Sequence, residues 1–193
     1  MHIAFRRRAL IATACMLGLT GAGWAQQQGA PRVKLSTSAG DIVIELAPDK
    51  APKTVENFLQ YVRDKHYDGT VFHRVIEDFM IQGGGYTPDL RQKPTRPPVP
   101  LEARNGLKND KYTVAMARTA KPDSATAQFF INVNDNATLD APNPDGYGYT
   151  VFGKVVAGTE VVDKIRAVRT GNKGGMQNVP LESVTIESAT VAN

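Results

Sequence analysis

Alternating apolar and polar positions open the part of the chain that is expected to fold. Residues alternate at a period of two from Val33 to Thr37, and apolar residues occupy every second position from Ile42 to Leu46, which is the period of a strand with one buried face. The residues between these two runs, Ser38–Asp41, include a glycine and are typical of a tight turn. The pattern therefore predicts a β-hairpin.

Two other segments carry apolar residues at helical spacing. Pro52 suits the first turn of a helix, where its missing N–H costs nothing, and the stripe that follows it predicts a helix of about 12 residues. This stripe consists of Val55, Phe58, Leu59 and Val62. A second helix is predicted at Thr159–Ala167, with Thr159 as its N-cap. Its expected buried face consists of Val161, Val162 and Ile165.

Short strand-like runs separated by Gly, Pro, Asn and Asp fill much of the remaining chain. They cover residues 71–76, 80–82, 112–117, 128–133 and 151–156, and residues 179–191 hold one or two closing strands. Many short strands with only two helices favour a β-barrel or a sandwich and argue against a doubly wound α/β fold. The proline-rich stretch 94–100 is predicted to be an ordered surface loop, not a linker between domains.

The first 25 residues have the layout of a targeting segment. Three arginines, Arg6–Arg8, precede an uncharged apolar run from Ala9 to Gly23, and small residues stand at the −3 and −1 positions of a cut after Ala25. This layout predicts a cleaved secretory signal peptide. A membrane anchor would need roughly 20 apolar residues, and Cys15 lies in the middle of the run, which disfavours a lipoprotein. Residues 26–31 are expected to be a flexible leader, and residues 32–193 a single domain.

Removal of this segment changes the charge of the protein. The chain has 193 residues, 23 basic and 19 acidic, and a formal net charge of +4. The segment carries three of the bases and none of the acids, as well as the single Cys and the single Trp. A nearly neutral domain without thiols remains, which excludes an internal disulfide and argues against nucleic acid as a partner. No later segment is apolar enough to predict a membrane span.

The segment 72–85, FHRVIEDFMIQGGG, has the densest set of candidate functional residues. His66 and His73 match no zinc-ligand spacing. The three glycines lack the Lys-Ser/Thr of a phosphate loop and are better explained by a tight turn or a close backbone approach. No nucleophile-elbow pattern is present. The composition instead favours the binding of an apolar group beside a fixed cation, Arg74.

A second segment, 115–132, reads AMARTAKPDSATAQFFIN. A strand period of two would place Gln128 and Phe130 on one face, and Phe129 and Ile131 on the other. One face would then fill the core while the other presents an amide beside an aromatic ring. An ordinary half-buried strand explains the pattern equally well.

Together, FHRVIEDFMIQGGG, AMARTAKPDSATAQFFIN and YTVFGKV, in this order, resemble the cyclophilin family of peptidyl-prolyl cis-trans isomerases. The similarity runs from about Val33 to Val191, and with the signal segment the chain resembles bacterial periplasmic cyclophilins. The resemblance implies a closed eight-stranded antiparallel barrel capped by two α-helices. It also implies isomerisation of X-Pro bonds in proline-containing polypeptides, without a metal or cofactor, by a periplasmic monomer that assists folding. A binding module or chaperone with little turnover is the alternative.

The resemblance also implies roles for individual residues. Arg74 would stabilise the twisted imide, and Gln82 would hold a backbone group of the substrate. The residues implied to form the apolar pocket for the proline ring are Phe79, Met80, Phe130 and Leu139. The main chain at Ala117 and Arg118 would pair with the peptide, and Gln128 would complete the polar wall.

Two positions depart from the family pattern. Thr138 stands where many relatives carry a Trp that contributes to cyclosporin binding, so weak inhibition by cyclosporin with retained activity is expected. Tyr149 stands where many carry His, at the end of a stretch, 140–150, that resembles an insertion. Tyr149 is counted among the expected substrate-binding residues.

Overall fold

The computed structural model describes residue 1 and residues 29–192, so the expected signal peptide and most of the leader lie outside the described residues. Its helices and strands, in chain order, are β1 (Arg32–Thr37), β2 (Gly40–Leu46), α1 (Pro52–Arg63), β3 (Thr70–Ile76), β4 (Met80–Gly83), β5 (Thr113–Met116), η1 (Pro122–Ser124), β6 (Phe129–Asn132), η2 (Ala137–Leu139), β7 (Val151–Ala157), α2 (Thr159–Arg166), β8 (Thr170–Lys173), β9 (Met176–Pro180) and β10 (Thr185–Ala192). None of the helices within these described ranges is long and apolar enough to cross a bilayer.

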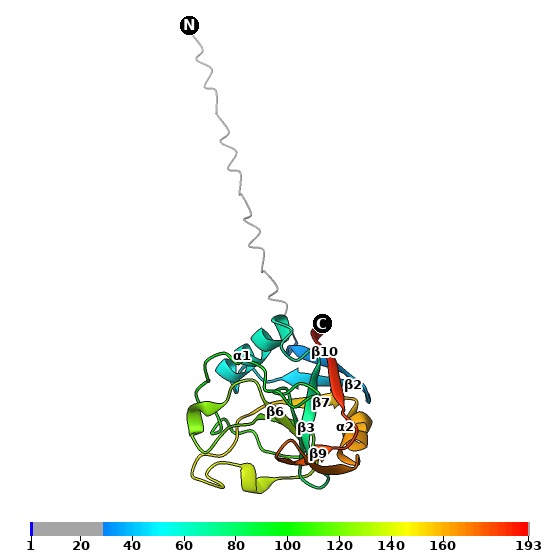
Figure 1. Cartoon of the computed structure of the whole chain (residues 1–193). Coiled ribbons are helices and arrows are strands. Elements are labelled where there is room, and N and C mark those ends of the chain that lie inside the picture. The colour runs from blue at the N-terminus through cyan, green and yellow to red at the C-terminus, as the bar shows by residue number, and fades with distance from the viewer. Residues whose placement is uncertain (2–28, 193) are drawn as a thin grey trace.

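The strands wrap into a barrel, with α1 beside it (Figure 1). Eight antiparallel strands close it, in the order β1-β10-β3-β4-β6-β5-β7-β2. The predicted hairpin forms β1 and β2, and its tight end is the pair Thr37 and Gly40. Closure of the sheet leaves no strand edge free for pairing with another chain. The structure thus confirms the barrel and decides against the sandwich that the strand pattern alone left open.

Aromatic rings fill the barrel and attach α1 to it. Phe58 of α1 lies 5.0 Å from Phe152 and 5.7 Å from Phe129, measured between ring centroids. Tyr67 meets Phe129 edge-on at 5.5 Å. All four side chains are almost completely buried, so the predicted apolar stripe of α1 packs into the main core. Tilted and edge-to-face pairs of this kind are the favoured aromatic geometries.

The prediction for α2 is confirmed in its buried face and wrong in its cap. Val161, Val162 and Ile165 are buried as expected. The N-cap is Gly158, not Thr159, and it adopts a left-handed backbone conformation with φ of 82°. A Cβ at Gly158 would lie 2.1 Å from the carbonyl oxygen of Asp41, so the closeness of β2 requires glycine here.

The C-terminal region holds one strand more than the sequence pattern indicates. Within the predicted range 179–191 the structure has β10, whereas β9 begins earlier, at Met176, and only ends in that range. β9 pairs with the unpredicted β8 in a separate two-stranded sheet. The β8 sequence, TGNK, is polar and largely exposed, so it carries no apolar alternation. By contrast, the proline-rich loop is ordered as predicted. The Arg96 N–H donates to the Tyr61 hydroxyl at 2.7 Å, and Val99 bridges to Ala125.

A second apolar cluster lies apart from the main core, on the other face of the barrel wall. It consists of Met80, Ala115, Phe130, Leu139 and Val151. Phe129 and Ile131 belong to the main core instead. The predicted division of the two faces of β6 is therefore confirmed, and the outer face carries the candidate site.

Candidate active site

Strand register sets five residues in one row across the barrel wall. Arg74 pairs with Gln82, Gln82 with Phe130, Phe130 with Ala115, and Ala115 with Val151. Directly opposed residues of neighbouring strands point to the same face of a sheet. The register therefore brings a cation, an amide and an aromatic ring side by side, although they come from three separate strands.

A pocket of about 110 Å³ opens over this row. It is lined by Arg74, Phe79, Met80, Gln82, Ala117, Arg118, Phe130, Leu139 and Tyr149. These are all the expected site residues except Gln128. The volume is well below the roughly 300–1,000 Å³ of sites for drug-sized ligands, so the pocket fits one small group.

The floor of the pocket is apolar and buried. Met80, Phe130 and Leu139 are 2%, 4% and 9% exposed. Phe130 also packs edge-on against Tyr149, with ring centroids 5.7 Å apart. Such a floor favours an apolar ring over a polar group, which would lose its hydrogen bonds with water on entry.

A chain of side-chain hydrogen bonds forms the polar wall. Arg74 Nη1 donates to Gln82 Oε1 at 3.4 Å, and Gln82 Nε2 donates to Gln128 Oε1 at 3.0 Å. Gln128 therefore holds the Gln82 amide in place, although it does not line the pocket itself. Arg74 has no carboxylate partner within residues 29–192, so its guanidinium keeps donors available on the pocket side.

The histidines and glycines of segment 72–85 have structural surroundings. His73 is buried against Tyr86, with ring centroids 4.6 Å apart, and burial lowers its pKa to about 4. Burial also lowers the pKa of His66, whose Nε2 lies 3.1 Å from the Gly84 carbonyl oxygen. Gly84 has φ of 83°, and a Cβ at Gly85 would lie 2.4 Å from Gln128 Cγ. The glycines thus provide the expected close approach. No group of three potential metal ligands occurs among the described residues.

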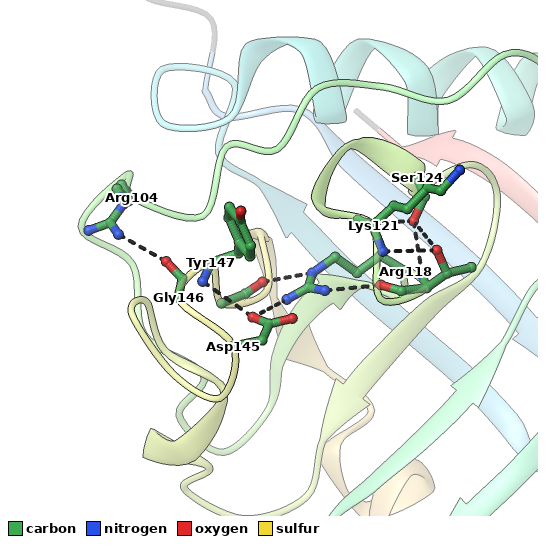
Figure 2. Close-up of polar contacts among 9 residues, drawn as sticks. Arg104, Arg118, Lys121, Ser124, Asp145, Gly146 and Tyr147 are labelled. Carbon is green, nitrogen blue, oxygen red and sulfur yellow. Dashed lines mark hydrogen bonds and ion pairs between the residues drawn. The ribbon is translucent and has the colours of Figure 1, made fainter.

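The Arg118 side chain turns from the pocket into the loop 140–149. Its Nε donates to the Gly148 carbonyl at 2.9 Å, and its Nη2 meets Asp145 Oδ1 at 2.8 Å (Figure 2). Its guanidinium carbon lies 4.5 Å from the centre of the Tyr149 ring. Sequence reasoning missed Asp145 and Gly148, because nothing in the sequence indicates which side chain the loop folds against.

Comparison with known proteins gives the family. The model for "Cyclophilin type peptidyl-prolyl cis-trans isomerase/CLD" matches residues 32–191. The chain belongs to the cyclophilin family. The resemblance carried by the three motifs is thereby confirmed, and the chain is a cyclophilin-type peptidyl-prolyl cis-trans isomerase.

Relatives of this cyclophilin cover nearly the whole barrel. Peptidyl-prolyl cis-trans isomerase cyp18 of Streptomyces antibioticus is 63% identical over 161 residues, which are 82% of this chain and 97% of the relative. Peptidyl-prolyl cis-trans isomerase A of Dickeya dadantii is 52% identical over 186 residues, 96% of this chain and 97% of the relative. A cyclophilin type isomerase of Cryptosporidium parvum has a similar structure, with a TM-score of 0.69 and 26% identity over 84% of this chain and 98% of that one.

Proposed function

We propose that Arg74 lowers the barrier to X-Pro rotation by donating to the prolyl nitrogen in the twisted state. The observation that supports this proposal is a guanidinium without a carboxylate partner, within residues 29–192, at the rim of an apolar pocket. Rotation breaks the amide resonance that makes the barrier about 18–20 kcal/mol. The nitrogen then regains a lone pair that a positioned donor stabilises, and does so best in a partly dry site.

The required acceleration is within reach of such a site. Uncatalysed isomerisation takes tens to hundreds of seconds, so a turnover near 10 per second needs about 1,000-fold acceleration. This factor corresponds to about 4 kcal/mol of preferential binding of the twisted state. One well-placed donor contributes about 3–4 kcal/mol in comparable sites, so no nucleophile or redox step is needed.

The pocket floor would receive the proline ring, and the polar wall would hold the adjacent backbone. Phe79, Met80, Phe130 and Leu139 provide the apolar surface, and Gln82, fixed by Gln128, presents its amide beside Arg74. The main chain at Ala117 and Arg118 would pair with the peptide, which fits the turn of the Arg118 side chain into the loop. The Cryptosporidium parvum isomerase has also been solved in the presence of the dipeptide Ala-Pro.

We infer further that the protein is exported, is cleaved after Ala25, and assists the folding of proteins in the periplasm as a monomer. The basic and apolar N-terminal segment supports export. The similarity to the Dickeya dadantii isomerase A extends over 96% of the chain and therefore reaches into this segment. N-terminal sequencing of the protein from the periplasmic fraction should begin at Gln26. A chain retained in the cytoplasm with Met1 intact would contradict export.

The test of the catalytic proposal is isomerisation of an Ala-Pro peptide by wild type, Arg74→Ala and Arg74→Lys. We expect Arg74→Ala to lower kcat/KM by about a hundredfold, and Arg74→Lys to recover only part because lysine lacks the planar fork. Arg96→Ala is the matched control, since Arg96 is a half-exposed arginine paired with Asp64, and it should behave as wild type. Equal activity of wild type and Arg74→Ala would refute the assignment.

A further inference from the structure

The loop 140–149 forms one side of the pocket through its last residue, Tyr149. It begins after η2 and ends before β7, and the Tyr149 N–H donates to the Leu139 carbonyl at 3.0 Å. Residues 142–147 are exposed, so the main core does not hold them. Between its two ends the loop is therefore held by a few polar contacts.

Two arginines supply those contacts. Among the described residues, the side-chain hydrogen bonds from other segments to residues 141–148 come from Arg104 and Arg118. The two ends of the loop are held separately, by hydrogen bonds from Asn109 to Asp140 and by the Tyr149 backbone bond to Leu139. Arg104 is exposed and donates once, to the Gly146 carbonyl at 3.0 Å. Arg118 forms hydrogen bonds with two points of the loop (Figure 2). It also lies over the Tyr149 ring, so it makes more contacts with the loop than Arg104 does.

The Arg118 side chain is buried, and the loop satisfies its charge. Only 2% of this side chain is exposed, against 35% of the Asp145 side chain. The hydrogen bond from Arg118 lowers the pKa of Asp145, with the Tyr147 N–H as a further donor. A buried guanidinium is costly unless it is paired and hydrogen-bonded, so the closed position of the loop is coupled to burial of Arg118.

Arg118 also fixes the ring that closes the pocket. The guanidinium covers one side of Tyr149, and Phe130 meets the same ring edge-on. The Met116 N–H donates to the Thr150 carbonyl at 3.0 Å. This backbone hydrogen bond brings together the two segments that carry Arg118 and Tyr149. Loss of the guanidinium would leave the Tyr149 ring with Phe130 as its aromatic contact, and residues 141–148 with one side-chain hydrogen bond from another segment, that of Arg104.

We propose that Arg118 is a positioning residue that holds the loop 140–149 closed and, through Tyr149, sets how tightly this isomerase binds its peptide substrates. The proposal rests on the proposed function, because it takes the pocket as the substrate site. It assigns the Arg118 side chain a role separate from peptide pairing by its main chain. The role requires arginine, because one planar guanidinium donates to the Gly148 carbonyl, the Asp145 carboxylate and the Thr119 carbonyl and also covers the Tyr149 ring.

The test compares KM and kcat of Arg118→Ala, Tyr149→Ala and the double variant on an Ala-Pro peptide. We expect Arg118→Ala to raise KM about tenfold, with kcat changed less than twofold, since bound substrate still meets Arg74. The double variant should be no worse than Tyr149→Ala, because residues that act through one another are not additive. Multiplicative effects, or an unchanged KM in Arg118→Ala, would overturn the proposal.

Further variants separate positioning from charge and from folding. Arg118→Lys should leave KM raised, and full rescue by lysine would overturn the requirement for the fork. Asp145→Ala, at an exposed residue, should raise KM about threefold even if Arg118→Ala does not fold, and an unchanged KM would count against the coupling.

Arg104→Ala is the matched loop control and should change KM less than twofold; a tenfold increase would remove the special role of Arg118. If the catalytic proposal is wrong, Arg74→Ala will have normal activity. That result is independent of the KM values of the loop variants.

Discussion

Acidification should destabilise this cyclophilin through one buried histidine. His73 is 5% exposed and packs at a tilt against Tyr86, and its Nδ1 has no hydrogen-bond partner in the described structure. Burial is the main cause that lowers its pKa from 6.5 to about 4, while the Val71 backbone and Gln128 oppose the shift. The neighbouring Arg74 also disfavours the charged form. The ring is therefore neutral in the folded protein at pH 7.

The sign and size of the effect follow from the two pKa values. Between pH 6.5 and about 4 the unfolded chain binds a proton at His73 that the folded protein does not. The contribution of neutral His73 to the free energy of unfolding is therefore fully present above pH 6.5, and it declines as the pH falls from 6.5 to about 4. The complete loss is about 3 kcal/mol, at 1.36 kcal/mol per pKa unit. Between pH 7 and pH 4.5 about 2 kcal/mol of it should appear.

The assay is urea unfolding of wild type and His73→Gln at pH 7 and pH 4.5, followed by far-UV circular dichroism. His66 contributes in the same direction in both proteins, since burial lowers its pKa too, so the difference between the two proteins isolates His73. We expect the free energy of unfolding of wild type to fall by about 2 kcal/mol more than that of His73→Gln. Equal losses in the two proteins would refute the reasoning.

Two further predictions concern the site. Gly85→Ala would place a Cβ 2.4 Å from Gln128 Cγ and so displace Gln128 from Gln82. We expect kcat/KM in the Ala-Pro peptide assay to fall about fivefold, since one supporting hydrogen bond is worth about 1 kcal/mol; unchanged activity would show that Gln128 does not position Gln82. Cyclosporin should inhibit weakly, because Thr138, exposed beside Leu139, replaces the Trp of many relatives, whereas inhibition at nanomolar concentration in the same assay would contradict this expectation.

Local sequence patterns predict which face of a strand each site residue lies on. Alternation along β6 predicts that Phe130 and Phe129 lie on opposite faces, and the structure places Phe130 in the pocket and Phe129 in the main core. Thr159 was the wrong choice for the cap of α2, because the deciding contact, between Gly158 and Asp41, joins distant segments. The sequence pattern does not predict β8, because its polar residues are held by pairing with β9 and not by burial. That pairing, like the contact of Gly158, is not visible within one short segment.

The sequence by itself determined the hairpin, the buried faces of both helices and, through three motifs, the family and most of the residues that line the pocket. These features depend on residue types and on spacings within short segments, which the order of the chain preserves. Only the tertiary structure decided that the sheet closes, and that Arg74, Gln82 and Phe130 share one row of opposed residues. It alone paired Arg118 with Asp145, 27 residues away. Such contacts arise from strand register and from the burial of a charge, and both depend on the whole barrel having formed.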